Sequence, residues 1–241
     1  MIAAFALLSL APVPPVDRFY DGHSPIESWD MVKVRKIHSA YGTCVVRRNH
    51  DISVRLVIEG LDNARVIKNY PGLIDGDCLV KVANSRNSIG LHLPGEMLRY
   101  SIADALVAKD LASPELTDLE RVAPLRHLSV EDLQFAAGRK PRSAEAQQSA
   151  IDLREGEIFM SKFGECVVRA DPLHAHQFLR ASVATAEESS ALKLLAGALT
   201  KCAPGGASFK VNRTMMRGTI AVNYYRLATA PRSLPTPGVT N

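Results

Sequence analysis

The side chains that could do chemistry in this chain are few, and its four cysteines are the first candidates. They are Cys44, Cys78, Cys166 and Cys202. No two of them have the short spacing of a zinc knuckle or of a thioredoxin-like redox motif. We therefore expect them to pair as disulfides, or else to stay reduced and buried, and we predict no metal site.

The histidines are the next candidates, because two of them lie close together in His174-Ala175-His176. On a strand these imidazoles would share a face, as metal ligands must. However, Asp171-Pro172 is typical of a helix start, and residues i and i+2 of a helix point about 200° apart. We predict surface histidines there. Asp75-Gly76-Asp77 resembles part of a calcium loop but lacks the remaining oxygen ligands, so we predict a polar turn.

Motifs of the common enzyme classes are absent from the sequence. It contains no Gly-x-Ser-x-Gly nucleophile elbow, no phosphate-binding Gly-rich loop, no His-Glu-x-x-His and no dinucleotide fingerprint. We therefore predict no catalytic residue and no cofactor. A hydrolase of an unfamiliar class stays as an alternative, in which His92, His174 or His176 would meet a carboxylate within hydrogen-bond reach.

A repeated phrase surrounds two of the cysteines. Tyr41 to Arg47 reads YGTCVVR, and Phe163 to Arg169 reads FGECVVR. In each half a second cysteine follows about 35 residues later. We therefore expect the disulfides Cys44–Cys78 and Cys166–Cys202, and closing a loop of this length stabilises a fold by on the order of 3 to 4 kcal/mol.

A second match follows each pair of cysteines. Met97 to Ala103 reads MLRYSIA, and Met215 to Ala221 reads MMRGTIA. Arg99 and Arg217 are the charged residues that this match retains, and they are candidate contacts for a shared acidic ligand. The alternative is a salt bridge or a helix-end contact inside each half. Three landmarks in the same order indicate a tandem duplication.

The duplication predicts a mainly α fold of two tandem helical repeats, each held by one disulfide. We place copy one at 28–108, a connector at 109–149, copy two at 150–228 and a disordered tail at 229–241. Apolar residues recur at helical spacing around Cys44 and Cys166, although the β-branched Cys-Val-Val could also form a strand. Short extended segments are expected at 89–93 and 208–211.

One helix start in copy two has a specific local signal. Thr185-Ala186-Glu187-Glu188 is a capping box. In such a box the Thr185 hydroxyl and the Glu188 carboxylate each bind an amide that the helix leaves unpaired.

The pattern [YF]-G-x-C-V-V-R, with a second cysteine about 35 residues on and the unit written twice, resembles a group of small exported bacterial proteins without an assigned function. The resemblance implies export and duplication. It supplies no catalytic residues.

The N-terminus also favours export. Ile2 to Leu10 is an uncharged apolar run that ends in small residues and a Pro-rich break. It is much shorter than the roughly 20 residues that span a bilayer, so residues 1–11 are typical of a signal peptide and we expect a periplasmic or secreted protein. No basic residue precedes the run, so a short membrane-associated or buried helix in a cytoplasmic protein stays as an alternative. We predict no transmembrane segment in the mature chain.

Composition and charge are those of an ordinary folded protein. Hydrophobic residues make up 46% and charged residues 22%, with a net charge of +4. Lysine and arginine are scattered, so nucleic-acid binding is not expected. Val32 to Lys36 is basic, and we predict a solvated helix face there rather than a patch for an anionic surface.

These observations favour an exported, non-enzymatic binding or envelope-associated module whose partner is an unknown protein or small ligand. Such a module should have an apolar groove between its copies, without clustered acids or bases. The alternatives are the hydrolase above and a cytosolic regulator with reduced cysteines.

Overall fold

The computed structural model describes residues 31–59, 70–83, 95–113, 119, 122–127, 129, 143–203 and 212–230. Within these ranges the regular structure is helical, and the predicted mainly α fold is confirmed. Several predictions fall outside the described residues, namely the signal peptide, the two extended segments, His92 and the tail beyond Ala230.

Copy one and copy two denote the two ranges of the predicted duplication, and the described residues of both are mainly helical. Copy one contains α1 (Met31–Arg48), α2 (His50–Glu59), the 3₁₀ helix η3 (Pro71–Leu73), α4 (Gly76–Ala83) and α5 (Gly95–Asp110). Copy two contains α7 (Ala144–Ala170), α8 (Pro172–Arg180), α9 (Ala186–Leu194), α10 (Ala196–Cys202) and α11 (Arg213–Thr229). Both Cys-Val-Val segments are helical, so the strand alternative was wrong. Helix α7 begins inside the residues that we assigned to the connector.

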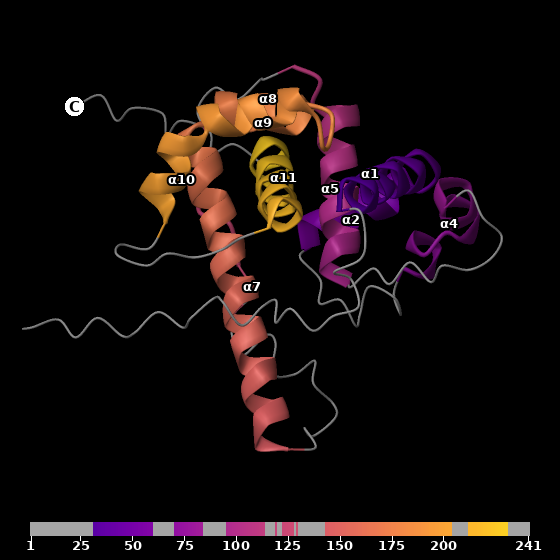
Figure 1. Cartoon of the computed structure of the whole chain (residues 1–241), viewed down its shortest axis with the longest axis horizontal. Coiled ribbons are helices and arrows are strands. Elements are labelled where there is room, and N and C mark those ends of the chain that lie inside the picture. Colours follow the sequence, from indigo (N-terminus) through magenta and orange to yellow (C-terminus); the bar gives the residue numbers. More distant parts are fainter. Residues whose placement is uncertain are drawn as a thin grey trace, which may run out of the picture.

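Helix α11 lies at the centre of the fold. It packs between α5 and α7, while α1 and α2 cover another side of α5 (Figure 1). Helices α8 and α9 contact each other, and α8 also packs on α11. Because α11 has neighbours on several sides, its residues from Arg217 to Tyr225 are all buried.

The glycine of each repeated phrase lies where two helices approach closely. A Cβ atom on Gly42 would lie 2.1 Å from the carbonyl oxygen of Ser101, and one on Gly164 would lie 2.7 Å from that of Thr219. Ser101 and Thr219 occupy the same place in MLRYSIA and MMRGTIA. The first and last helices of each copy therefore cross at corresponding positions, which only a residue without a side chain allows.

The last helices of the two copies also meet closely. Where α5 packs on α11, the ring of Tyr100 fills the space beside Gly218, and a Cβ atom on this glycine would lie 2.2 Å from the ring. This contact brings the two copies together in the interior.

Both predicted disulfides are present. Cys44–Cys78 joins α1 to α4, and Cys166–Cys202 joins α7 to α10, with Cα atoms 5.7 and 5.8 Å apart. The alternative of four reduced cysteines was therefore wrong for this structure. None of the helices that the structure describes combines the length and the apolarity needed to cross a bilayer.

The two predicted caps of copy two are present, with one difference. Asp171 accepts a hydrogen bond from the amide of His174 and caps α8. Thr185 accepts one from the amide of Glu188 and caps α9. The Glu188 carboxylate does not return to the amide of Thr185 as a capping box requires. Its Oε2 atom accepts from the amide of Ala184 at 3.0 Å, and its other oxygen binds side chains in the interior.

Replacing Gly42 with alanine should destabilise the protein, because the new methyl group would overlap a backbone carbonyl of α5. We expect the free energy of unfolding to fall by about 1 to 3 kcal/mol or more, as in other overpacked sites. Urea denaturation followed by circular dichroism measures this. Gly197→Ala in α10 is the matched control, because a Cβ atom there meets nothing within 4 Å. Equal losses for both variants would contradict the close crossing.

Candidate functional site

A buried cluster of four charged side chains joins the two copies. We call it the four-charge cluster, and it consists of Arg35 from α1, Asp104 from α5, Glu188 from α9 and Arg217 from α11. Arg35 and Arg217 both donate to Oε1 of Glu188, at 2.5 and 3.2 Å. The Nε atom of Arg217 lies 2.9 Å from Oδ1 of Asp104. Each buried charge therefore has an opposite charge beside it, which offsets the cost of removing it from water.

Arg35 corrects one expectation from the sequence. It belongs to the basic run that we predicted as a solvated helix face, yet its side chain is only 9% exposed. Its neighbours Lys33 and Lys36 are exposed, as predicted. The side chain of Arg35 is buried because it pairs with a carboxylate from the other copy.

Arg217, one of the two predicted ligand contacts, binds carbonyl groups at the end of α8. Its Nη1 donates to the carbonyl of Phe178 at 2.8 Å, and its Nη2 to that of Leu179 at 2.7 Å. Arg99, the other predicted contact, makes the corresponding bond in copy one, from Nη2 to the carbonyl of Val57 at 3.1 Å. Both arginines thus make the helix-end contact that was the alternative to ligand binding.

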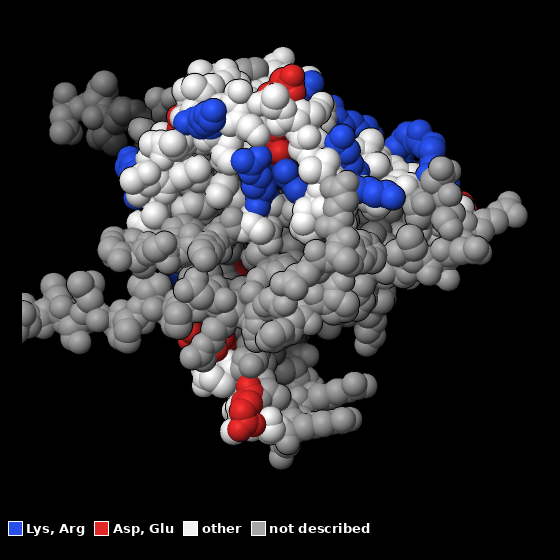
Figure 2. Space-filling view, viewed as in Figure 1, with Lys and Arg blue, Asp and Glu red and all other residues white. Residues whose placement is uncertain are grey.

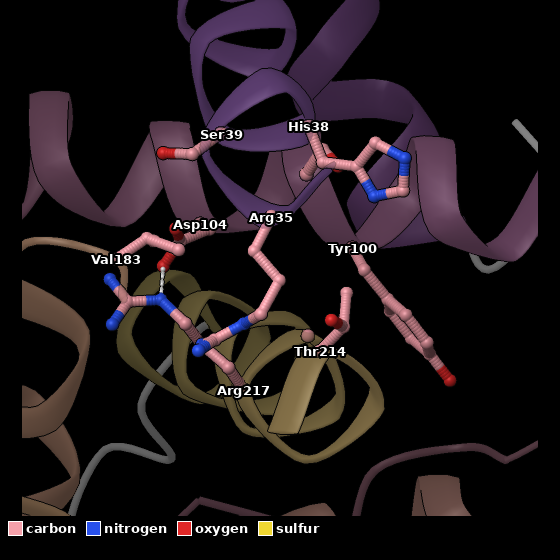
Figure 3. A pocket seen from close by; sticks show the side chains of 10 residues that line it. Arg35, His38, Ser39, Tyr100, Asp104, Val183, Thr214 and Arg217 are labelled. Carbon is pink, nitrogen blue, oxygen red and sulfur yellow. Dashed lines mark hydrogen bonds and ion pairs between the residues drawn. The ribbon is translucent and has the colours of Figure 1, made fainter. Parts of the chain in front are cut away.

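A small hollow opens beside the four-charge cluster, between α1, α5 and α11 (Figure 3). Its cavity volume is about 30 Å³. Its polar lining includes Arg35, His38, Ser39, Asp104, Thr214 and Arg217. The sequence predicted an apolar groove without clustered acids or bases between the copies; the exposed surface of the hollow is mostly apolar, but charged groups cluster beside it. Ionic partners from distant parts of the chain therefore add to the apolar packing of α5 on α11 between the copies.

Two nitrogen atoms in the walls of this hollow are buried and lack a hydrogen-bond partner among the described residues. They are Nε of Arg35 and Nδ1 of His38. Nearly all buried polar atoms in folded proteins have a partner, and an unpaired one costs about 1 to 3 kcal/mol. Both atoms therefore favour a polar guest in the hollow.

Burial changes the ionisation of two groups around the hollow. Burial raises the pKa of the Asp104 carboxyl, although the neighbouring Arg217 guanidinium acts to lower it. Burial also lowers the pKa of the His38 imidazole. Both shifts favour the neutral form of the side chain.

Of the histidines proposed for a hydrolase, His174 meets a carboxylate within hydrogen-bond reach, His176 bonds a backbone carbonyl, and His92 lies outside the described residues. The Nδ1 atom of His174 lies 2.7 Å from the Asp171 carboxylate, which caps the same helix. The prediction of surface histidines was wrong for His176, which is 5% exposed and whose Nε2 atom lies 2.9 Å from the carbonyl of Leu111. His50, which the sequence did not single out, lies 2.9 Å from the carboxylate of Asp110.

His127 forms a second arrangement that the sequence did not single out. Its Nδ1 atom lies 2.8 Å from Oγ of Ser161, and its Nε2 atom lies 2.5 Å from Oε2 of Glu165. These are the residue types of a serine, histidine and acid triad. Ser161 and Glu165 are four residues apart and lie on one face of α7. This helical spacing was the only feature of the sequence that could have pointed to the cluster.

The position of Ser161 does not suit nucleophilic catalysis. It lies in the interior of α7, where backbone amides are used by the helix and none is left to stabilise an oxyanion. Glu165 also accepts hydrogen bonds from the amide of Leu125 and from Arg169. The cluster therefore holds the segment around Leu125 and His127 against α7.

The polar turn before Cys78 caps α4. The Asp75 side chain accepts from the amide of Cys78 at 3.1 Å and pairs with Nε of Arg48 at 2.7 Å. Asp77 also pairs with Arg48. In the part of the chain that the structure describes, no three histidine, cysteine or carboxylate side chains converge as metal ligands would.

Asp104 and Glu165 should change stability with pH in opposite directions. Because burial raises the pKa of Asp104, the folded state holds this proton more tightly than the unfolded state. The stability of wild type relative to Asp104→Asn should therefore be greatest at low pH and fall as pH rises through the folded pKa.

Burial alone would raise the pKa of Glu165, but hydrogen bonds from Leu125, Arg169 and His127 lower it. The stability of wild type relative to Glu165→Gln should be fully present above the unfolded pKa and be lost on acidification. Urea unfolding of the three proteins across the acidic range measures both trends. Parallel trends for the two variants would contradict the assignment.

Comparison with known proteins gives no indication of function. No family model, curated protein or solved structure matches the chain. The four-charge cluster and the hollow beside it are therefore the basis on which a function is proposed.

Proposed function

We propose that the protein is an exported, non-enzymatic binding module that holds the carboxylate of a small ligand in the hollow between its two copies. The observation that carries this proposal is Arg35, which lines the hollow and whose buried Nε atom has no partner among the described residues. A guanidinium N–H group is a strong donor to carboxylates, because charge assists the hydrogen bond.

The charges around the hollow suit a single negative group. Arg35 and Arg217 carry two positive charges, and Glu188 supplies one negative charge between them. Burial raises the pKa of the Asp104 carboxyl, so this acid takes up a proton more readily than an exposed aspartate when an anion enters. His38 adds a neutral nitrogen that lacks a described partner.

The size of the hollow suits the head of a ligand rather than a whole molecule. A cavity of about 30 Å³ matches the volume that one molecule occupies in liquid water. A carboxylate head is of similar size, so the remainder of a ligand would extend toward solvent. The hydrogen-bonded interior around Arg217 would keep the donors in place as the ligand enters.

Export is part of the proposal. The two disulfides fit a protein that folds in an oxidising compartment. The apolar run at Ile2 to Leu10 and the resemblance to exported bacterial proteins agree with this. We infer a periplasmic or secreted location and a signal peptide at residues 1–11.

The proposal also includes a duplicated origin for the two copies. In each copy the glycine of the repeated phrase contacts the same position of the last helix. In each copy the matched arginine, Arg99 or Arg217, donates to a carbonyl of the second helix, at Val57 or Leu179. Such corresponding contacts support the duplication of one ancestral unit.

Protein purified from its native compartment should carry no free thiol. Intact mass measured before and after alkylation, without reductant, should therefore be unchanged, and N-terminal sequencing should begin after the apolar run. Reduced and alkylated protein is the control, because it should gain four labels, one for each cysteine. Four labelled cysteines without reductant, or an intact N-terminus, would remove the case for export.

Acetate is the simplest probe of the hollow. In nitrogen–proton NMR spectra of the full chain, we expect acetate to shift the side-chain Nε–H resonance of Arg35, and the shift should reach a plateau as acetate is added. Sodium chloride at equal ionic strength is the control and should not produce this shift. An anion raises the pKa of both Asp104 and His38, so binding takes up protons. Affinity should therefore fall as pH rises.

Arg35→Lys should weaken acetate binding by about tenfold or more, because it keeps a positive charge beside Glu188 but removes the Nε–H donor. Arg213→Lys is the matched control, since this arginine is exposed on α11 and donates to Ser189. A hollow that holds only water would give no saturable shift. That result, or an unchanged affinity in Arg35→Lys, would overturn the proposed site.

A further inference from the structure

A second, larger depression lies between α1 and α4, beside the Cys44–Cys78 disulfide. We call it the basic groove, and its cavity volume is about 710 Å³. Its charged lining residues are Lys33, Lys36, Arg47 and Lys81. Its other lining residues are small or mostly apolar, and none of the described lining residues is acidic.

The groove follows one stripe of α1. Lys36, Ala40, Thr43 and Arg47 are spaced by three or four residues, so they lie on one face of the helix. The small side chains in the middle of this stripe make the floor, and the basic residues stand at its two ends. Lys81 faces them from α4.

Three of the four cations of the groove are not neutralised by acids among the described residues. No ion pair joins Lys36, Arg47 or Lys81 to a carboxylate within the described part of the chain. Arg48, the next residue along α1, is different because it pairs with both Asp75 and Asp77. The positive charge of the groove is therefore available to a partner.

The wider surface has the same polarity. On the face drawn in Figure 2, lysine and arginine side chains gather over the region that α1 occupies in Figure 1, and acidic side chains are visible near the lower end of α7. The groove also has an apolar component. Val32 lines it and is 48% exposed, and Ile37 and Val82 line it as well.

We propose that the basic groove docks the protein on the surface of an anionic phospholipid bilayer. Lipid phosphates would lie against Lys36, Arg47 and Lys81, and Val32 would contact the boundary between head groups and acyl chains. Basic side chains interleaved with apolar ones are the combination by which proteins lie on such surfaces. A nucleic acid or an acidic protein would use the cations but not the apolar floor.

Sedimentation with lipid vesicles tests this directly. The full chain should bind vesicles that contain phosphatidylglycerol and should not bind vesicles of phosphatidylcholine alone. Binding should weaken as salt is raised, because exposed charges are screened. Absence of binding to both kinds of vesicle would overturn the proposal.

Two matched triple variants distinguish an effect of the groove residues on vesicle binding from an effect of the net charge of the protein. Lys36→Glu, Arg47→Glu and Lys81→Glu together should reduce vesicle affinity at least tenfold. The control variant carries Lys109→Glu, Lys193→Glu and Lys201→Glu, which change the net charge equally at exposed positions on α5, α9 and α10. The control should keep most of the binding, and an equal loss in both variants would show a general charge effect and overturn the groove.

The apolar component and the competing partners need separate measurements. Val32→Ser should weaken vesicle binding several-fold without a change of charge. Groove-dependent binding to single-stranded DNA or polyglutamate in place of the vesicles would overturn the membrane assignment. Because Lys36, Arg47 and Lys81 do not line the hollow, the groove variant should still bind acetate. The two proposals can therefore fail independently.

Discussion

The carboxylate of Glu188 is the contact on which the arrangement of the two copies depends. It is completely buried, and one of its oxygens accepts from Arg35 of the other copy and from Arg217 of its own. A buried charge that loses its partner is strongly destabilising, by about 3 to 5 kcal/mol. The four-charge cluster draws one side chain from each of four helices, so it also sets the walls of the hollow. The same side chains therefore determine both the shape of the proposed binding site and the association of the copies.

Features that act within one turn of helix, or within a repeated phrase, were predictable from the sequence. The helical class follows from apolar spacing, and the caps at Asp171 and Thr185 each act over three residues. Glu188 marks the limit of this reasoning. Its place after Thr185 is typical of a capping box, yet its carboxylate binds Arg35, which is 153 residues away. No local pattern contains that partner.

The candidate site was predictable only in part for the same reason. The repeat singled out Arg217, but its partners are backbone carbonyls of α8 and a carboxylate of α5, which become neighbours only in the folded chain. The expected groove was only partly right, because charged partners from distant parts of the chain cluster beside the hollow and no local pattern predicts such pairs. His127 was missed because it lies in the connector, where neither periodicity nor the repeat provides a signal.

The contact between Tyr100 and Gly218 has a consequence for the ancestry of the protein. These residues hold corresponding positions in MLRYSIA and MMRGTIA, and they meet where α5 packs on α11. If both positions carried a tyrosine, the two rings would compete for one space. Under the proposed duplication, a symmetric dimer of copy one could not adopt this packing. Under the same proposal, joining the copies in a single chain would have allowed them to diverge into unlike, complementary halves.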